Sequence, residues 1–384
     1  MDYFSSDFKL GIIGGGQLGK MLLQVTSKLN IKTNILDSSP DSPCKNLCNE
    51  FSLGKLMDYD TIYKFGKKCN VITYEIEHIN VEALLKLESE GVVVNPSPSI
   101  LKIIQNKNTQ KKFFLKNNIP TANFWHFSSI NEFKLFLSND EISFPCVWKK
   151  TKFGYDGFGV KILKSIDDIS ELPDSEFIIE DYIPFQKELA TTIARNDSGQ
   201  VEVFPIVEMS FNDESNQVEY VICPAQISSE NMIQAKKIAL SVSKSFGHTG
   251  ILAVEMFLTK DHKVLVNEVA PRPHNSAHYS IEACMSSQFD QHIRSILNLP
   301  LGCSKSNINA IMVNLVGEKN FSGLVNYKGL EESMKFDNVS VHIYGKSETK
   351  PNRKMGHATI LDTDLSRGIK IAKSVKKSIR IKTN

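Results

Sequence analysis

The sequence predicts a protein of mixed class, α/β and α+β. Three observations support this class. Apolar runs alternate with helical patterns over the first 100 residues, two glycine-rich loops follow apolar runs, and short strands dominate the later sequence. The length of 384 residues is natural for two or three domains. We therefore expect domains at residues 1–105, 106–302 and 303–384.

Composition excludes several classes of protein. Hydrophobic residues make up 41% and charged residues 23%, which is ordinary for a globular enzyme and excludes a disordered chain, a collagen-like fibre and a coiled-coil rod. Lys and Arg number 45 against 43 Asp and Glu, a net charge of +2. With so little excess charge, we expect neither nucleic acid nor a membrane surface as the partner.

Three features of the sequence favour a cytoplasmic location. No apolar run approaches the roughly 18 residues that span a membrane. The start of the chain lacks the basic and then apolar pattern of a signal peptide. The seven cysteines include one close pair, Cys44 and Cys48, without a second pair to complete a zinc site, so we expect reduced thiols.

The first domain follows from its order of strands and helices. Apolar runs predict strands at residues 9–13, 32–36, 70–73 and 92–94, and helical patterns predict helices at residues 17–29 and 81–90. Strand, helix and strand at this spacing form a βαβ unit with a parallel sheet. The sequence therefore predicts a Rossmann-like N-terminal domain.

A glycine-rich loop at residues 14–19 joins the first strand to the first helix. It fits G-x-G-x-x-G, and Asp37 ends the next strand, which completes the pattern of a dinucleotide site. This pattern supports one alternative, a nicotinamide-dependent oxidoreductase. Its physical content is narrower, because glycines and a helix N-terminus favour any phosphorylated ligand, and a tight turn without a ligand also fits.

The second region is predicted from strands around another glycine-rich loop. We expect helices at residues 109–117 and 233–246, and strands at residues 146–150, 177–180, 188–194, 201–207, 251–258 and 264–269. Lys149 lies at the end of one strand, just before the loop at residues 154–159. A glycine-rich flap after such a lysine can fold over a triphosphate, although a mobile hairpin loop fits equally well.

The strands at residues 251–258 and 264–269 form a predicted hairpin with three polar side chains. Glu255 interrupts an apolar run, and Asn267 and Glu268 lie in the partner strand. A carboxylate within an apolar run costs several kcal/mol unless it is paired or bound to a metal. Magnesium bound with a nucleotide takes one or two carboxylates plus phosphate oxygens. We therefore favour a magnesium site over a solvent-facing pair with basic partners.

Two later segments also contain polar clusters. His274 and His278 follow prolines and lack the glutamate of a His-Glu-x-x-His zinc site, which favours a substrate pocket instead. We expect short strands over the last 80 residues. A basic group there, Lys346, Arg353, Lys354 and His357, suits either a grip on a phosphate or a solvated face.

Taken in order, these segments resemble the N5-carboxyaminoimidazole ribonucleotide synthetase family of the ATP-grasp superfamily. The resemblance depends on residues 14–21, 73–78, 109–111, 149, 154–157, 267–276 and 353–357. It implies a central ATP-grasp fold and a small C-terminal β-rich domain. The implied reaction uses ATP to convert bicarbonate to carboxyphosphate, which carboxylates 5-aminoimidazole ribonucleotide and leaves ADP and phosphate.

The resemblance also implies roles for individual residues. ATP would be held by Lys107, Lys149, Gly154, Tyr155, Asp156, Gly157, Phe158, Gly159, Glu180, Asp181, Tyr182, Ile183, Glu188 and Asn267. Mg²⁺ would be held by Glu255 and Glu268. The ribonucleotide would be held by Gln17, Glu75, Asp156, Arg272, His274, Asn275, Lys346 and Arg353, the last two at its phosphate. The catalytic residues would be Tyr155, Asp156, Arg272 and His274.

The sequence departs from the family pattern at a few positions. Phe153 and Phe158 replace a glycine and a basic residue of the flap, and Lys107 stands where arginine is common. The role of Glu208 stays open. A formate-dependent glycinamide ribonucleotide transformylase, or a nucleotide-binding interaction protein without catalysis, would share several of these features. The family implies a homodimer whose product passes to a separate mutase.

Overall fold

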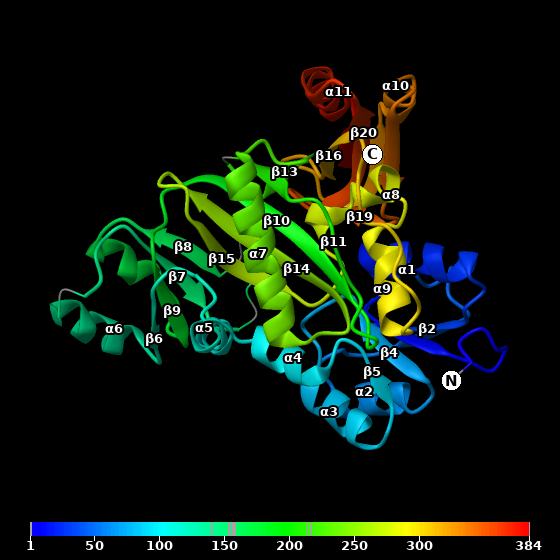
Figure 1. The fold of residues 1–384 in the computed structure, drawn as a ribbon, viewed down its shortest axis with the longest axis horizontal. Helices are drawn as coiled ribbons and strands as arrows, with labels where there is room; N and C mark the ends of the chain where they lie inside the picture. The colour runs from blue at the N-terminus through cyan, green and yellow to red at the C-terminus, as the bar shows by residue number, and fades with distance from the viewer. Residues whose placement is uncertain are drawn as a thin grey trace.

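The computed structural model describes residues 2–139, 141–152, 154, 159–212, 214–215 and 217–383. Figure 1 shows the N-terminal domain beneath a large central sheet, a smaller sheet to one side, and the C-terminal residues above. The mixed α/β class predicted from the sequence is confirmed.

The N-terminal domain contains a five-stranded parallel sheet in the order β3-β2-β1-β4-β5. Its strands are β1 (Leu10–Ile13), β2 (Thr33–Asp37), β3 (Glu50–Leu53), β4 (Val71–Tyr74) and β5 (Val93–Val94), and its helices are α1 (Gln17–Lys28), α2 (Tyr59–Gly66), α3 (Val81–Ser89) and α4 (Pro98–Ile104). The carboxyl ends of parallel strands meet at one edge, so the residues that follow β1, β2 and β4 lie together there.

A smaller antiparallel sheet follows, in the order β6-β9-β7-β8. Its elements are α5 (Lys107–Lys116), β6 (Phe124–Phe127), α6 (Ile130–Phe136), η1 (Leu137–Asn139), β7 (Cys146–Lys150), β8 (Val160–Leu163), η2 (Ile166–Glu171) and β9 (Phe177–Asp181). Phe127, Phe133, Trp148 and Phe177 pack one face of this sheet against α6. Its opposite face can therefore present polar groups such as those of Lys149 and Glu180.

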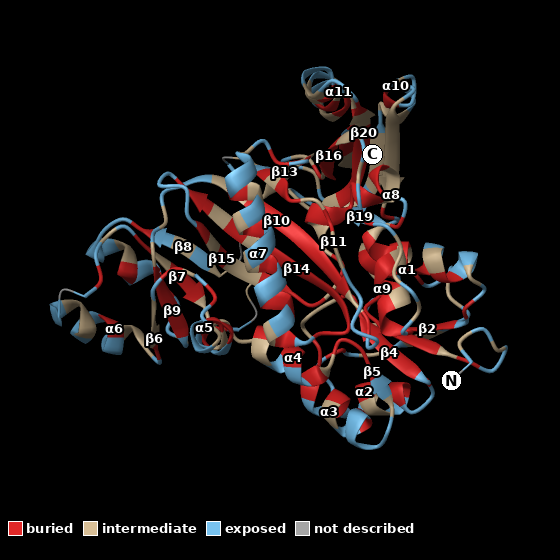
Figure 2. Cartoon of the chain, in the orientation of Figure 1, coloured by how far each residue is buried: buried red, intermediate tan, exposed pale blue. Residues whose placement is uncertain are grey.

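The largest sheet has nine strands, in the order β15-β14-β10-β12-β13-β16-β20-β18, with β11 added beside β10. From the middle of the chain come β10 (Phe185–Arg195), β11 (Val201–Val203), β12 (Val207–Phe211), β13 (Val218–Cys223), α7 (Ser229–Phe246), β14 (Gly250–Thr259) and β15 (Val264–Ala270). Helix α7 covers one face through an apolar cluster that includes Leu189, Leu252 and Val254. Figure 2 shows buried residues along β10 and β14, under this helix.

The C-terminal residues extend this same sheet instead of forming a separate one. Their elements are β16 (Asn309–Val316), β17 (Gly323–Lys328), α10 (Leu330–Ser333), β18 (Val339–Ile343), β19 (Glu348–Thr349), β20 (Lys354–Asp362), α11 (Leu365–Ser378) and β21 (Arg380–Thr383). Strand β13 pairs with β16, so the ladder of hydrogen bonds continues across residue 302. A three-stranded sheet, β19-β17-β21, lies beside it.

Three expectations for individual elements were wrong. The strand expected at residues 201–207 is two strands, because Pro205 has no amide hydrogen and stands between them. The expected helix at residues 233–246 begins earlier, at Ser229, where the Ser228 hydroxyl accepts a hydrogen bond from the Asn231 amide. The last residues contain the 14-residue helix α11, capped by Asp364, and not only strands.

Helix α9 (Gln288–Ile296) connects the N-terminal domain to the large sheet. It follows the short elements η3 (Asn275–Ala277) and α8 (Ser280–Ala283). The buried ring of His292 lies 2.7 Å from the Thr73 hydroxyl of β4 and accepts a hydrogen bond from the Ile251 amide of β14. Lys20 Nζ adds a bond of 2.8 Å to the Ile343 carbonyl. These contacts hold the carboxyl ends of β1 and β4 against the large sheet.

Two further observations concern the chain as a whole. Within the described residues, no helix is both long enough and apolar enough to cross a membrane. Each of the seven cysteines is a free thiol.

Candidate active site

A chain of polar contacts joins the three regions of the fold. The ammonium of Lys107, at the start of α5, pairs with Glu268 on β15, and Lys149 on β7 donates to Asn267 Oδ1 at 2.8 Å. The loop that follows β15 contains Arg272, whose guanidinium lies 3.0 Å from Glu77 of the N-terminal domain. Of the predicted site residues, Lys107, Lys149, Asn267, Glu268 and Arg272 are therefore brought together along β15 and the loop that follows it.

Glu180 is buried between two lysines. Its carboxylate lies 2.9 Å from Lys149 Nζ and 3.1 Å from Lys111 Nζ, and the side chains of Lys111 and Glu180 are each only 3% exposed. Burial acts to raise the pKa of Glu180, but the two ammonium groups outweigh it and hold that pKa below its ordinary value. Burial lowers the pKa of Lys111 to about 8. Lys111, Lys149 and Glu180 therefore form a buried ionic cluster next to Asp181, the last residue of β9.

The hairpin of β14 and β15 places two carboxylates opposite one another, as the sequence predicts. Glu255 pairs in register with Glu268, and Glu188 of β10 lies on the same face, one strand over. Burial raises the pKa of Glu255, and the neighbouring charge of Glu268 adds to this shift. The Lys107 ammonium lowers the pKa of Glu268, which therefore retains its charge. His274 Nε2 lies 3.2 Å from Glu255 and partly offsets the repulsion.

The donor set on this hairpin suits a cation that a nucleotide also binds. Within the part of the chain that the structure describes, no group of three or more His, Cys, Asp or Glu side chains is placed to hold a metal alone. Glu255 and Glu268 supply two carboxylates, and magnesium bound with a triphosphate needs only one or two. The residues present therefore fit a Mg²⁺ ion that would be bound by these two carboxylates together with phosphate oxygens of a nucleotide.

Glu188 and Glu208 lie on opposite faces of the large sheet. Burial raises the pKa of Glu188 to about 7, although Lys149 partly counteracts it. Glu208 lies opposite Leu189, whose side chain packs under α7, and it pairs with Lys187 and accepts a hydrogen bond of 2.9 Å from the Gln226 amide. Glu208 therefore stabilises the turn before α7, on the face away from the site.

The last residue of β9 and the two that follow it, Asp181, Tyr182 and Ile183, are residues that the sequence assigns to nucleotide binding. Asp181 accepts a hydrogen bond of 2.8 Å from Asn123, Tyr182 is exposed, and the Ile183 carbonyl accepts from the Phe185 amide at 2.8 Å. The flap is only partly described. The Gly159 carbonyl accepts from the Lys150 amide at 2.8 Å and Gly154 is half-buried, whereas Phe153, Tyr155, Asp156, Gly157 and Phe158 lie outside the described residues.

The predicted ribonucleotide residues begin at the carboxyl end of β4. Glu75 accepts a hydrogen bond of 2.6 Å from the Gly16 amide at the start of α1, next to Gln17. Burial raises the pKa of Glu75 to about 7, against the lowering effects of that amide, Arg272 and Lys346. These interactions place Gln17, Glu75, Arg272 and Lys346 around one region.

The glycine-rich loop does not present free amides as a dinucleotide site would. The Gly15 amide donates to Asp37 at 2.5 Å, and the Gly16 amide donates to Glu75. Two carboxylates thus occupy the position that a pyrophosphate takes in a Rossmann site. A Cβ at Gly14, where φ is +97°, would lie 2.8 Å from Glu75, so the loop glycines serve the close approach of this side chain. Asp37 is held in the loop and is not available as a ribose ligand.

The remaining predicted residues lie in the loop after β15 and in the segment between β18 and β20. The side chains of Asn275 and Asn314 exchange hydrogen bonds of 2.9 and 2.8 Å. Lys346 donates to the Lys354 carbonyl at 2.7 Å, and Arg353 donates to the Glu348 carbonyl at 2.7 Å. His357 is not part of an exposed basic group, because it is buried and burial lowers its pKa well below the ordinary value.

Sequence reasoning missed three residues that support the site. Lys111 lies four residues after Lys107, on the same face of α5, which begins two residues before the predicted helix at residues 109–117. Glu77 lies two residues after Glu75 and pairs with Arg272. No sequence pattern indicated Gln288, because it contacts the loop at His274, which lies 14 residues earlier and comes close only in the folded protein.

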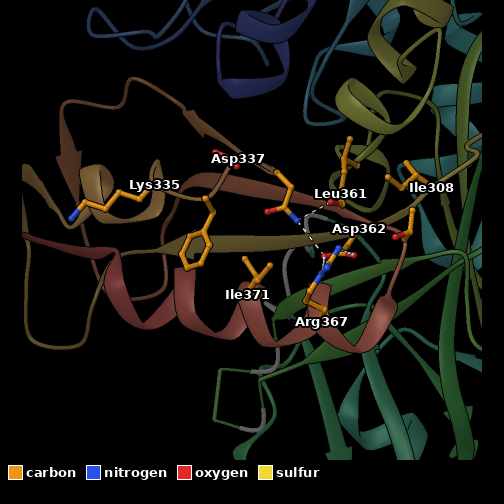
Figure 3. Close-up of a pocket in the computed structure, with 10 residues that line it drawn as sticks. Ile308, Lys335, Asp337, Leu361, Asp362, Arg367 and Ile371 are labelled. Carbon is orange, nitrogen blue, oxygen red and sulfur yellow. Dashed lines mark hydrogen bonds and ion pairs between the residues drawn. The ribbon is translucent and has the colours of Figure 1, made fainter.

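A separate hollow of about 490 Å³ lies in the C-terminal region, between α11 and β20. Figure 3 shows Arg367 paired with Asp362 at its centre, and the two groups are 2.7 Å apart. Of the described site residues, none is among those that line this hollow. It is therefore distinct from the candidate active site.

Family models match most of the chain. The model of the ribonucleotide synthetase preATP-grasp domain matches residues 8–105, that of the ATP-grasp domain matches residues 112–289, and that of the phosphoribosylaminoimidazole carboxylase C-terminal domain matches residues 310–370.

Curated relatives are similar over nearly the whole chain. The phosphoribosylaminoimidazole carboxylase of Saccharomyces cerevisiae is 38% identical over 370 residues, and the match covers 93% of this chain and 64% of the yeast protein. This chain therefore spans somewhat less than two thirds of that relative. The N5-carboxyaminoimidazole ribonucleotide synthase of Staphylococcus aureus is 35% identical over 364 residues, which cover 93% of both chains.

Solved structures show the same fold. An N5-carboxyaminoimidazole ribonucleotide synthetase from Thermotoga maritima has a TM-score of 0.90 and 42% identity, and the match covers 98% of this chain and 100% of that one. An N5-carboxyaminoimidazole synthase from Aspergillus clavatus, in complex with ADP and 5-aminoimidazole ribonucleotide, has a TM-score of 0.87 and 31% identity over 97% and 98% of the two chains. The predicted ATP-grasp architecture is thereby confirmed.

The buried cluster at Glu180 generates the first prediction. We expect Lys111→Met to lower the free energy of unfolding by about 3 to 5 kcal/mol, because it leaves a buried carboxylate with one cation. Urea denaturation measures this loss. The double variant Lys111→Met, Glu180→Met should recover part of it, since both charges are then removed. A single variant as stable as the wild type would contradict the assigned pairing.

The raised pKa of Glu75 generates the second prediction. Its pKa in the folded state is about 7, above the ordinary value of 4.5, so the folded state favours the protonated carboxyl. The resulting stability is fully present below pH 4.5 and is lost as the pH rises through 7. Relative to the wild type, Glu75→Gln should therefore gain up to about 3 kcal/mol between those pH values. A stability difference that stays constant over this range in denaturant titrations would refute the shift.

Proposed function

The chain belongs to the N5-carboxyaminoimidazole ribonucleotide synthetase family of ATP-grasp enzymes, and on that premise we propose that it carboxylates 5-aminoimidazole ribonucleotide. The reaction would consume ATP and bicarbonate and release ADP and phosphate, as a step in purine biosynthesis. The observation that carries the proposal is the pairing of Glu255 with Glu268 beside Lys149, directly before the loop that contains Arg272 and His274. The similarity to the Aspergillus clavatus enzyme, solved with ADP and this ribonucleotide, also supports it.

The small sheet and the hairpin would bind the nucleotide. Lys107 and Lys149 would neutralise its phosphates, and Asn267 would orient them from the hairpin. The strand end from Glu180 to Ile183 would receive the adenine, with Glu188 near the ribose. Mg²⁺ at Glu255 and Glu268 would supply charge stabilisation as the terminal phosphoryl group moves. Gly154, Tyr155, Asp156, Gly157, Phe158 and Gly159 would form a flap that excludes water from the reactive carboxyphosphate.

The N-terminal domain and the loop after β15 would bind the ribonucleotide. Gln17, Glu75, Arg272, His274 and Asn275 would contact its ring and sugar, and Lys346 and Arg353 its phosphate. Arg272 is held by Glu77 at 3.0 Å and His274 by Glu255 at 3.2 Å, so both side chains are oriented before substrate arrives. Such preorganisation is what lowers the entropic cost of bringing an amine to a short-lived acyl donor. Tyr155, Asp156, Arg272 and His274 would be the catalytic residues.

Two further parts of the proposal, a homodimer and transfer of the product to a separate mutase, depend on the family alone. We propose a cytoplasmic location from the sequence features given above. The domain limits at residues 1–105, 106–302 and 303–384 also remain a proposal, although the preATP-grasp match ends at residue 105. The occupied amides of the glycine-rich loop argue against a nicotinamide-dependent oxidoreductase.

The proposal is tested by ADP release in the presence of ATP, Mg²⁺ and bicarbonate. We expect 5-aminoimidazole ribonucleotide to stimulate release strongly, because the proposed reaction reaches its product only when the amine acceptor is present. Glycinamide ribonucleotide with formate serves as the control for a formate-dependent transformylase. Stimulation by that pair alone would exclude the proposed acceptor.

The metal assignment is tested on the same hairpin. We expect Glu268→Gln to lower kcat by at least about 100-fold, because it removes charge at the developing transition state. Asp261→Asn is the matched control, since it removes an exposed carboxylate from the turn between β14 and β15. Near-wild-type turnover in Glu268→Gln would refute the metal assignment.

A further inference from the structure

We propose that Gln288 is a positioning residue for the ribonucleotide site, because its side-chain amide binds both backbone groups of His274. The inference deepens the proposed function and rests on it. It concerns residues 271–275, here called the acceptor loop, which contain Arg272 and His274.

Gln288 is the first residue of α9 and is fully buried. Its Oε1 accepts a hydrogen bond of 2.7 Å from the His274 amide, and its Nε2 donates to the His274 carbonyl at 2.8 Å. The side-chain amide of Gln288 thus satisfies both the N–H and the C=O of His274, as the backbone of a neighbouring β-strand would. The acceptor loop has left β15 at Ala270, so this side chain replaces the partner strand that the loop lacks.

The second amide hydrogen of Gln288 fixes its orientation. Nε2 lies 2.9 Å from His278 Nδ1, and burial lowers the pKa of His278 well below its ordinary value. His278 is therefore neutral and accepts at Nδ1, so its own proton lies on Nε2. Both Nε2 hydrogens of the Gln288 amide are used, and the reversed orientation would break both bonds to the His274 backbone, because it would place Oε1 against the carbonyl and Nε2 against the amide.

The anchor itself is rigid. The Gln288 amide nitrogen of the backbone donates to Ser280 Oγ at 2.9 Å, and the Ser287 hydroxyl caps α9 by accepting from the Asp290 amide at 3.1 Å. The same helix binds Thr73 through His292, two residues before Glu75. Helix α9 therefore supports both sides of the ribonucleotide site, the acceptor loop through Gln288 and the end of β4 through His292.

The side chains that the acceptor loop presents are held at their tips as well. Arg272 contacts Glu77, and His274 contacts Glu255 and Ser276. These contacts fix the loop only if its backbone is already in place, because each spans a long, rotatable side chain. Loss of the Gln288 clamp should therefore misplace the acceptor loop without unfolding the protein, and small misplacements are costly to reactions that depend on alignment.

Gln291 provides a matched control on the same helix. It is also fully buried, and it makes the same clamp on a residue away from the site: its Nε2 donates to the Gly302 carbonyl at 2.6 Å, and its Oε1 accepts from the Gly302 amide at 3.0 Å. Each substitution to Met removes a two-bond clamp on one residue's backbone with little change in side-chain volume, and Gln288→Met also removes the bond to His278. If the clamp on His274 were merely structural, neither variant would change the KM for the ribonucleotide relative to that for ATP.

The test compares steady-state kinetics of the two variants in the full-length enzyme. We expect Gln288→Met to raise the KM for 5-aminoimidazole ribonucleotide by roughly 10- to 100-fold, with the KM for ATP unchanged within about twofold. Gln291→Met should leave both values near wild type. An unchanged ribonucleotide KM in Gln288→Met, or equal effects of the two variants, would overturn the proposal.

A second measurement does not depend on activity. Hydrogen exchange at the His274 amide should accelerate in Gln288→Met and not in Gln291→Met, because only the first removes its acceptor. Gln288→Glu, which keeps the acceptor and loses both donors, is the second variant. If both Gln288 variants fail to fold while Gln291→Met folds, the role of Gln288 is structural and the proposal falls.

The failure of the proposed function would look different. In that case the wild type itself would show no stimulation of ADP release by the ribonucleotide. Stimulation in the wild type together with normal kinetics and normal exchange in Gln288→Met would overturn only the positioning role. If exchange at the His274 amide is the same in Gln288→Met as in the wild type, the positioning role is overturned even if the wild type has no activity.

Discussion

The balance of charge around one hairpin is the constraint on which the rest of the structure depends. Glu255 and Glu268 lie opposite one another on β14 and β15, a position that two carboxylates tolerate only with nearby cations. Lys107, Lys149 and His274 supply the compensating groups, and they come from α5, the small sheet and the acceptor loop. The ion pairs and hydrogen bonds that neutralise these two carboxylates therefore position α5, the small sheet and the acceptor loop around the hairpin.

The same balance explains how such a site can accept a charged ligand. Lys107 and Lys149 already contact the hairpin. Phosphates could therefore bind to these two ammonium groups, and a divalent cation to the carboxylates, without moving the side chains into place first. Glu180, which pairs with both Lys111 and Lys149, fixes the orientation of the Lys149 ammonium group. On the other side of the hairpin, Gln288 and His292 of α9 hold the acceptor loop and the end of β4. The regions proposed to bind the nucleotide and the ribonucleotide thus each have a supporting contact that is already formed without ligand.

Much of this arrangement could be predicted from the sequence, for physical reasons. Buried strands of the first domain, the strand at Cys146–Lys150 and the hairpin with Glu255 and Glu268 have strong apolar patterns interrupted by costly charges. Tertiary contacts could not be predicted in the same way. Gln288 contacts His274 across 14 residues of sequence and Lys111 contacts Glu180 across 69, so no local pattern shows which partner each one has. The dinucleotide fingerprint misled because pattern alone does not show that carboxylates occupy the loop amides.

We propose that the hairpin carboxylates, Glu255 and Glu268, accept a triphosphate beside them only together with a divalent cation. The direct measurement is calorimetric titration of ATP into the wild-type protein, first with excess Mg²⁺ and then with Mg²⁺ removed by chelation. We expect chelation to weaken ATP binding by at least about tenfold, because the triphosphate and the carboxylates then repel one another at close range. An ATP affinity that is the same with and without Mg²⁺ would contradict it.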